Sequence, residues 1–269
     1  MKIIALSLSL ALCAFAAEEK KEKSVEQIRV LPVKRTPEPE SSIILISIPK
    51  NNAVIKDNPV WVQTRVEGYP VGSGSQFDRA NEVAVSKRGQ TIHVIVDDRP
   101  YFPVFEPALD PFNEEGWYYQ TSYRFELPKL SPGAHLVRVL LGRSFGECLK
   151  GEYAYSAVTF NVGKSSEAPA YDLTQPYITY NEPSNQMYLE ENTPVLLDFY
   201  ISNCELSSDG YKVRLTVDGT TSRTLTAWQP YYIYGLKKGN HTIRLDLINS
   251  RGKLVSGPLS SSQQTITIH

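Results

Sequence analysis

The chain has 269 residues, of which 28 are Lys or Arg and 29 are Asp or Glu, so its net charge at pH 7 is −1. This balance excludes the basic footprint with which proteins bind nucleic acid or an anionic membrane surface. The chain has three cysteines, which excludes a scaffold stapled by several disulfides and leaves the hydrophobic core to stabilise the fold.

Residues 1–16 read MKIIALSLSLALCAFA. One lysine, a short apolar run and small residues at Ala14 and Ala16 are typical of a secretory signal peptide that is cut after Ala16. An alternative is lipid attachment at Cys13, although Leu12 is bulkier than the small residue expected before a lipidated cysteine. No later segment approaches the ~20 apolar residues that span a bilayer. We therefore expect an extracytoplasmic protein without a transmembrane segment, whether periplasmic, secreted or outer-membrane-associated.

Residues 17–41 read AEEKKEKSVEQIRVLPVKRTPEPES. Charges of both signs and repeated prolines leave little apolar surface to bury, so this composition predicts a flexible, disordered arm. Its expected role is that of a simple spacer.

From residue 42 onward the pattern is strand, turn, strand. The stretch PVWVQTRVEG places Val60, Val62, Thr64 and Val66 on one face, which is the period-two signature of a half-buried strand. Similar patterns continue to residue 163, and residues 164–171 read as a linker because they begin KSSEAPA. We expect one domain over 42–163 and a second over 172–269.

The second half repeats the first. NTPVLLDFYIS matches DNPVWVQTRVEG, and GYKVRLTVDG matches GQTIHVIVDD. Farther on, KKGNHTIRLDLINSRG matches LSPGAHLVRVLLGRSFG, and QTITIH matches VTFNVG. Because no segment has helical periodicity, two copies of one unit indicate an all-β chain built of two tandem antiparallel β-sandwiches.

The repeated pattern of a turn glycine, a histidine and an alternating strand, followed by a polar turn and a last strand, resembles bacterial immunoglobulin-like or fibronectin-III-like modules. The resemblance covers essentially the whole chain after the expected cleavage at Ala16 and implies an immunoglobulin-like fold. Antibody-type hallmarks are missing, since no pair of cysteines bridges the sheets and Trp61 precedes the strand that usually carries the core tryptophan. A fold of this kind hosts many activities, so it implies no function by itself.

No motif for catalysis or metal binding is found. The stretch VGSGSQ lacks the order of a nucleophile elbow, and no metalloprotease, phosphate-loop or dinucleotide motif is present. Acidic residues between Glu106 and Glu115 could form a loop calcium site, although their spacing matches no EF-hand. We expect no catalytic residue, no metal and no cofactor.

His135 and His241 each follow a turn glycine by two residues, at corresponding points of the two repeats. A catalytic or metal-binding histidine needs partners at suitable spacing, and each repeat supplies one such histidine. We therefore expect both imidazoles to cap or pack across a sandwich edge. Asp97 and Asp98, which end a strand, are expected to form a turn.

The repeats differ by two insertions in the first domain, and insertions in sandwich loops commonly carry binding residues. The first insertion should lie beside GRSFGECLKG, because the B–C and F–G loops share one end of a sandwich. That end would point away from the second domain if the domains run head to tail. The candidate binding residues on the loop GRSFGECLKG are Arg143, Glu147 and Lys150.

The second insertion is rich in aromatic residues. Exposed rings bind sugars and peptides, whereas buried rings cover a sandwich edge or a contact between domains. Both interpretations stay open from the sequence. The candidate binding residues here are Tyr101, Phe105, Trp117 and Tyr118.

Cys148 and Cys204 fall on opposite sides of the expected arrangement, beyond the ~7 Å limit for a disulfide, so we expect two free thiols. The leading interpretation is a non-catalytic binding or envelope-organising protein that recognises a protein or peptide partner. The alternative is a carbohydrate-binding accessory protein that uses the aromatic insertion of the first domain. A hydrolase with an unrecognised site is a third interpretation, which the lack of a catalytic constellation disfavours.

Overall fold

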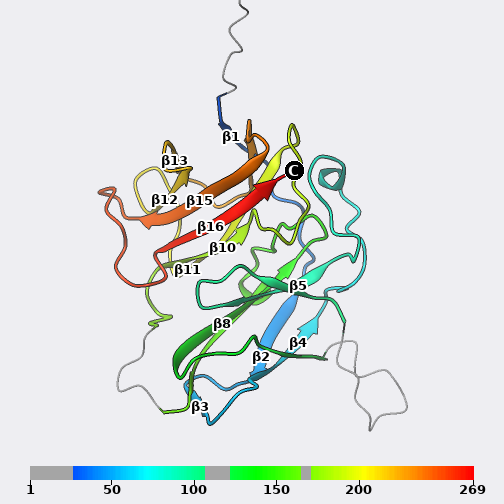
Figure 1. The fold of residues 1–269 in the computed structure, drawn as a ribbon, viewed down its shortest axis with the longest axis vertical. Coiled ribbons are helices and arrows are strands. Elements are labelled where there is room, and N and C mark those ends of the chain that lie inside the picture. The colour runs from blue at the N-terminus through cyan, green and yellow to red at the C-terminus, as the bar shows by residue number, and fades with distance from the viewer. Residues whose placement is uncertain (1–26, 107–121, 165–170) are drawn as a thin grey trace, which may run out of the picture.

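The computed structural model describes residues 27–106, 122–164 and 171–269, which form four β-sheets in two sandwiches. Figure 1 shows the second sandwich above the first, with β5 and β8 of the first facing β10 and β11 of the second. The two described helices are single 3₁₀ turns, η1 at Asp78–Asn81 and η2 at Glu152–Ala154. Neither of these helices has the length and hydropathy of a membrane span.

The first sandwich contains a three-stranded and a five-stranded sheet. The three-stranded sheet has the order β2 (Ile43–Ile48), β4 (Trp61–Glu67) and β7 (Ser122–Glu126). The other has the order β3 (Ala53–Ile55), β9 (Tyr155–Val162), β8 (Gly133–Gly142), β5 (Thr91–Val96) and β6 (Phe102–Val104). All neighbours are antiparallel except β3 and β9. The inward residues of the alternating strands form one core, as the period of two requires.

The second sandwich contains two four-stranded sheets. One has the order β1 (Arg29–Pro32), β14 (Tyr231–Tyr234), β11 (Val195–Ser202) and β10 (Tyr177–Glu182). The other has the order β13 (Thr221–Leu225), β12 (Lys212–Val217), β15 (Gly239–Ile248) and β16 (Ser261–Ile268). A separate hydrophobic core lies between these sheets.

The internal repeat inferred from the sequence is confirmed in three dimensions. The order β2-β4-β7 recurs as β10-β11-β14, and the order β9-β8-β5-β6 recurs as β16-β15-β12-β13. Irregularities recur as well, because the register shifts at the ends of both β2 and β10 and then pairs Ile48 with Gln63 and Glu182 with Asp198. The chain is therefore all-β, with two sandwiches of the immunoglobulin-like kind.

The two sandwiches pack sheet face against sheet face. Strands β5, β10 and β11 are buried at every residue, which requires cover on both faces of each sheet. Ile95 and Leu140 of the first sandwich form a buried cluster with Tyr200 of the second. The molecule thus has four sheet layers, and the arrangement of domains end to end that the sequence suggested is wrong.

The expectation of a disordered arm over 17–41 is wrong for its described part. Strand β1 pairs antiparallel with β14 from Arg29–Tyr234 to Pro32–Tyr231, so the arm completes a sheet of the second sandwich. Val30 packs against the core of that sandwich. A strand that adds to the edge of a sheet needs few apolar residues, because main-chain hydrogen bonds supply much of the contact. The composition of the arm therefore did not predict strand β1.

Candidate functional site

A buried ion pair joins the two sandwiches. Lys150 Nζ, from the loop after β8, lies 2.6 Å from Asp198 Oδ1 on β11, with side-chain exposures of 1% and 0%. Lys150 Nζ also donates to the carbonyl oxygen of Cys148 at 3.0 Å, and Asp198 Oδ2 accepts from the Cys148 N–H at 3.0 Å. Burial by itself lowers the pKa of Lys150, but the attraction of Asp198 outweighs it and raises that pKa. Lys150 is therefore charged, and both side chains have hydrogen-bond partners within the interface.

Asn181 on β10 extends this cluster to His93 on β5. Its Nδ2 donates to Asp198 Oδ2 and to the Gly146 carbonyl oxygen, both at 2.7 Å. Its Oδ1 is then the acceptor for His93 Nδ1, 2.6 Å away. The proton of His93 therefore lies on Nδ1, and burial lowers the pKa of His93 to about 4, so the ring is neutral at pH 7.

The His93 ring is wedged between two neighbours. On one side it stacks on Tyr101, with ring centroids 3.9 Å apart and planes inclined by 9°. On the other it lies against Gly142 of β8, where a Cβ atom would be 2.2 Å from His93 Nε2. Gly142 is therefore required by the histidine that faces it.

A second buried carboxyl lies beside this ring. The Tyr101 hydroxyl donates to Glu182 Oε1 at 2.6 Å, and the Ser184 hydroxyl donates to the same atom at 3.2 Å. Burial raises the pKa of Glu182 to about 8, so its carboxyl is protonated at pH 7. Gly146 approaches this carboxyl with φ +88°, and a Cβ atom there would lie 2.8 Å from Glu182 Oε1.

The N-terminal segment crosses this interface as a strap, defined here as residues 29–38. On the second sandwich Val33 N–H donates to the Pro230 carbonyl at 3.0 Å, and the Arg35 guanidinium lies 5.0 Å from the Trp228 ring centroid. On the first sandwich Glu38 accepts from the N–H of Lys150 at 2.7 Å. The strap thereby connects both sandwiches.

The strap also contacts the loop after β8 and η1. Glu147 accepts from the Thr36 N–H at 3.0 Å and forms an ion pair with Arg79. Arg143 donates to the Pro37 carbonyl and lies over Phe77, with 4.5 Å to the ring centroid. Glu147 and Arg143 are each 3% exposed, so their charges are used inside the molecule.

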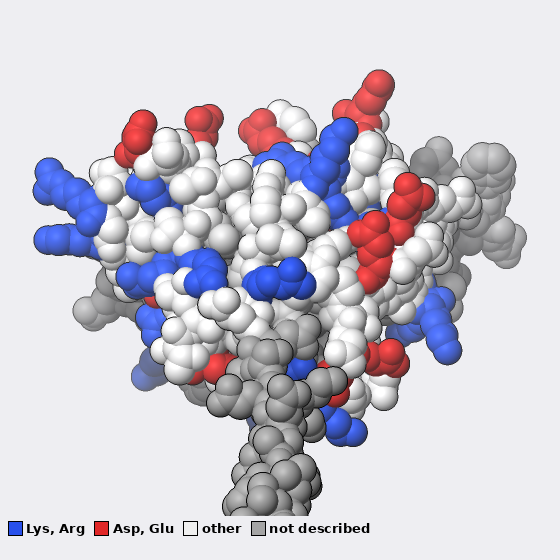
Figure 2. All heavy atoms as spheres, turned by 90° about the horizontal axis from the view of Figure 1, so that it is seen from above, with Lys and Arg blue, Asp and Glu red and all other residues white. Residues whose placement is uncertain are grey.

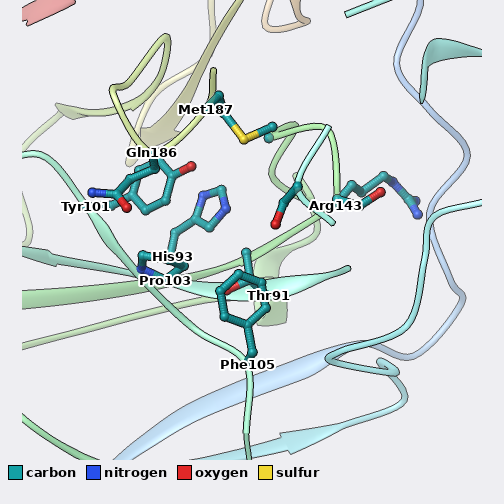
Figure 3. Close-up of a pocket in the computed structure, with 11 residues that line it drawn as sticks. Thr91, His93, Tyr101, Pro103, Phe105, Arg143, Gln186 and Met187 are labelled. Carbon is teal, nitrogen blue, oxygen red and sulfur yellow. The ribbon is translucent and has the colours of Figure 1, made fainter. Parts of the chain in front are cut away.

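Figure 3 shows a small cavity at the junction of the two sandwiches, with His93, Tyr101, Phe105 and Arg143 from the first and Gln186 and Met187 from the second. Its empty volume is about 230 Å³, open mouth included, which is below the range of roughly 300–1,000 Å³ for ligand pockets. Ser144, another lining residue, exchanges hydrogen bonds with Ser75 at 3.1 and 3.2 Å. We assign this cavity to the packing of the two sandwiches.

The twin histidines are structural, as the sequence indicated. His135 Nδ1 lies 2.9 Å from Asp97 Oδ2, and its Nε2 lies 2.8 Å from the Ser131 carbonyl oxygen. His241 makes the same two contacts with Asp218 and Lys237, both at 2.7 Å. Each imidazole therefore ties the turn after one strand to the start of the strand that pairs with it in the sheet.

The structure brings together five of the seven candidate binding residues, but inside the molecule. Their exposed fractions are 4% for Tyr101, 9% for Phe105, 3% for Arg143, 3% for Glu147 and 5% for Lys150. The first insertion does lie beside GRSFGECLKG, since Arg79 pairs with Glu147. The expectation that this loop points away from the second domain is wrong, because Lys150 contacts Asp198.

Three further expectations concern residues in or near these loops. Trp117 and Tyr118 lie outside the described residues. Cys148 and Cys204 are both free thiols, as expected. However, Cys148 lies at the contact between the sandwiches rather than at a remote end.

One surface that the sequence analysis missed is the outer face of the sheet β2-β4-β7, which we call the apolar end face. It presents Ile43, Leu45 and Ile48 of β2 and Trp61 of β4, with exposed fractions of 38%, 56%, 48% and 41%. The Arg124 guanidinium of β7 lies 4.8 Å from the Trp61 ring centroid. The sequence signal was the run IILISI, which is apolar on both faces of the strand instead of one.

The other end of the four-layer stack is the outer face of the sheet β13-β12-β15-β16, and this face is polar. Asp246 of β15 forms ion pairs with Arg214 and Arg244, both at 2.8 Å, and the outward residues of β16 include Gln263 and Thr265. Figure 2 shows the top of the molecule in the view of Figure 1, where basic and acidic side chains lie interspersed. The two ends of the four-layer stack therefore differ in chemistry.

No metal-binding cluster is found within the described ranges, where no three His, Cys, Asp or Glu side chains gather around a common point. The buried ionisable groups described above at the contact between the sandwiches form hydrogen bonds and ion pairs within the chain. Their arrangement can hold the sandwiches in register, and this is the role that their geometry supports.

No protein-family model and no curated protein matches the chain. Solved structures similar to it include fibronectin(III)-like modules of CbhA from Clostridium thermocellum, with 11% identity and a TM-score of 0.29 over 84% of this chain and 94% of that one. Another is SGBP-B of the Bacteroides ovatus mixed-linkage glucan utilization locus in complex with a heptasaccharide, with 11% identity and a TM-score of 0.22 over 91% of this chain and 70% of that one. A third is dimeric latent PorU from Porphyromonas gingivalis, with 12% identity and a TM-score of 0.26 over 86% of this chain and 20% of that one. At these TM-scores and identities the likenesses carry no information about function.

Proposed function

We propose that this chain is a non-catalytic, extracytoplasmic binding or envelope-organising protein, and that it recognises a protein partner through the apolar end face. The observation that carries the proposal is an equivalence between the two repeats. The sheet β2-β4-β7 corresponds to β10-β11-β14, and the outer face of β10-β11-β14 is the face that docks against another β-sheet in this molecule.

The equivalence holds residue by residue. On β4 the outward residues are Trp61, Gln63 and Arg65, and the same positions on β11 are Leu196, Asp198 and Tyr200. The three β11 residues are 5%, 0% and 5% exposed because the first sandwich covers them. Of their β4 counterparts, Trp61 is 41% exposed, Arg65 is exposed and Gln63 is half-buried.

An exposed apolar face on a soluble sandwich marks an interaction site, because leaving it in water has a free-energy cost that burial against a partner removes. Isolated exposed apolar residues are ordinary, but four of them on two neighbouring strands form one patch. The absence of a catalytic role is proposed because the buried charged groups Lys150, Asp198 and Glu147 are all committed to contacts within the chain. The extracytoplasmic location rests on the signal-peptide pattern of residues 1–16.

Site-specific photo-crosslinking tests this proposal. A benzophenone amino acid replaces Leu45, and the purified chain is irradiated in an extract of the cells that make it. The matched control carries the same group at Tyr188 of the second sandwich, which is 65% exposed. We expect discrete protein adducts from position 45, with a yield that Trp61→Ala lowers several-fold, and no such adducts from position 188.

Equal labelling from both positions would contradict the proposal. So would a glycan ligand, which a glycan array would reveal as sugar binding that Trp61→Ala abolishes. Either result would move the function away from recognition of a protein by this face.

A further inference from the structure

The apolar end face has an ordered layout. The register pairs Ile43 of β2 with Glu67 of β4 and Leu45 with Arg65, while Ile48 lies opposite Gln63. The exposed apolar residues of β2 therefore form a row along one margin of the face. The charged residues lie on the two strands beside that row.

Those charges alternate in sign and cancel. On β4, Arg65 and Glu67 are two residues apart and form an ion pair of 2.5 Å. On β7, Arg124 and Glu126 are likewise two residues apart and both point outward. The face is thus neutral, with a cation and an anion side by side on each strand, which is a pattern that can be complementary to itself.

Within the described ranges, the other end of the molecule offers no matching apolar surface. The outer face of β13-β12-β15-β16 presents Lys212, Arg214 and Arg244 around the single carboxylate of Asp246. Laying the apolar row of one chain on this face of another would bury exposed charges against isoleucine and leucine, which is unfavourable. A head-to-tail stack of copies is therefore disfavoured.

We propose that the partner of the apolar end face is a second copy of the chain, so that two chains associate through their first sandwiches about a two-fold axis. This inference rests on the proposed function, because it names the partner of the same face. A two-fold axis in the plane of contact and perpendicular to the strands lays β2 on β2 of the other chain and runs them antiparallel. The apolar rows then cover each other. Each strand that carries an Arg–Glu pair faces the same strand of the other chain, which runs in the opposite direction and so sets arginine near glutamate.

A dimer of this kind uses the outer face of β2-β4-β7 as the molecule already uses the equivalent outer face of β10-β11-β14. Inside one chain the β10-β11-β14 face contacts the first sandwich through apolar residues such as Leu196 and Tyr200, with polar pairs set between them. In the pair, Leu45 and Ile48 would supply the apolar contact and Arg65 with Glu67 the polar one. The dimer leaves the polar end face of each second sandwich at its two outer ends.

Sedimentation of the purified chain over a wide range of concentrations tests this inference. We expect a monomer–dimer equilibrium whose dissociation constant rises at least about tenfold with Leu45→Arg, because the change places a charge in an apolar contact. The matched control is Leu254→Arg in the second sandwich, where the leucine is 44% exposed, and it should leave the dissociation constant unchanged. Circular dichroism and the thermal midpoint, measured at a concentration low enough that all three proteins are monomeric, should be the same, since both leucines are exposed.

A wild-type chain that stays monomeric at all concentrations would overturn the inference, and so would a dimer that Leu45→Arg leaves intact. These failures are distinct from failure of the proposed function. If the purified chain is monomeric while the crosslinker at position 45 captures a different protein, the face binds a protein but not its own copy. If neither association nor capture occurs, both proposals are wrong.

Discussion

Lys150 and Asp198 meet at 2.6 Å in the layer between the two sandwiches, one supplied by the loop after β8 and the other by β11. Both side chains are almost fully buried, and each also binds Cys148. Two immunoglobulin-like repeats joined by a short linker are thereby held face to face as one body.

Breaking this pair should destabilise the chain strongly. Removal of one partner leaves a buried charge without compensation, so Lys150→Met or Asp198→Asn should lower the free energy of unfolding by about 3–5 kcal/mol. Urea denaturation measures this. Because neutral replacements of both partners leave no lone charge, and asparagine keeps an acceptor oxygen for the Cys148 N–H, Lys150→Met with Asp198→Asn should recover most of the loss. A double variant as unstable as the sum of the two single variants would contradict this account of the pair.

Glu182 should make the chain less stable in alkali. Its pKa is raised from 4.5 to about 8 by burial, so the folded state prefers the protonated acid. Its contribution is complete below pH 4.5 and is lost as the pH rises through about 8. Glutamine at this position is neutral at every pH. The unfolding free energy of Glu182→Gln should therefore fall less between these pH values than that of the wild type. Parallel pH profiles of the two proteins would show that Glu182 is not a buried neutral acid.

His93 should act in the opposite direction, in acid. Burial lowers its pKa from 6.5 to about 4, so its contribution to stability is complete above pH 6.5 and is lost as the pH falls through about 4. Nuclear magnetic resonance of the imidazole should show a neutral ring with the proton on Nδ1 throughout the range between these values. An imidazole that gains its proton near pH 6.5 would rule out the buried contact with Asn181.

The twin histidines should be coupled to their aspartates. His135→Ala and Asp97→Ala each remove one side of the same contact, so a double-mutant cycle should give a coupling free energy of about 0.5–3 kcal/mol. The cycle of His241 and Asp218 in the second sandwich is the internal match and should give a similar value. Simple additivity in both cycles would mean that these contacts contribute nothing to stability.

The repeat made most of the fold predictable. The alternation around Val62 and the equivalent run around Leu197 identify inward residues, and the constant spacing of Gly133–His135 and Gly239–His241 aligns the last strands. Both are local patterns that a single sandwich must satisfy. For that reason the fold class and the role of the histidines followed from sequence.

The contact between the sandwiches could not be predicted in this way. Asp198 on β11 and Gln63 on β4 are equivalent polar positions in the repeats, yet Asp198 is fully buried and Gln63 is only half-buried. Which outer face of a sandwich is covered depends on how the other sandwich packs against it. The alternation of apolar residues along a strand does not predict this. The strap was missed for the same reason, since four residues of β1 are stabilised mainly by the hydrogen bonds of β14.

The central claim is that the sandwiches pack face to face and so leave the apolar end face free. A disulfide across the contact tests it most directly. Ser262 Oγ of β16 donates to Asp98 Oδ1 at 2.6 Å, so cysteines at these two positions, with Cys148 and Cys204 replaced by alanine, should form an intramolecular disulfide under mild oxidation. The matched pair with cysteines at Asp98 and Gln263, whose side chain is exposed on the opposite face of β16, should stay reduced. Equal crosslinking in both pairs, or none in the first, would contradict the face-to-face arrangement.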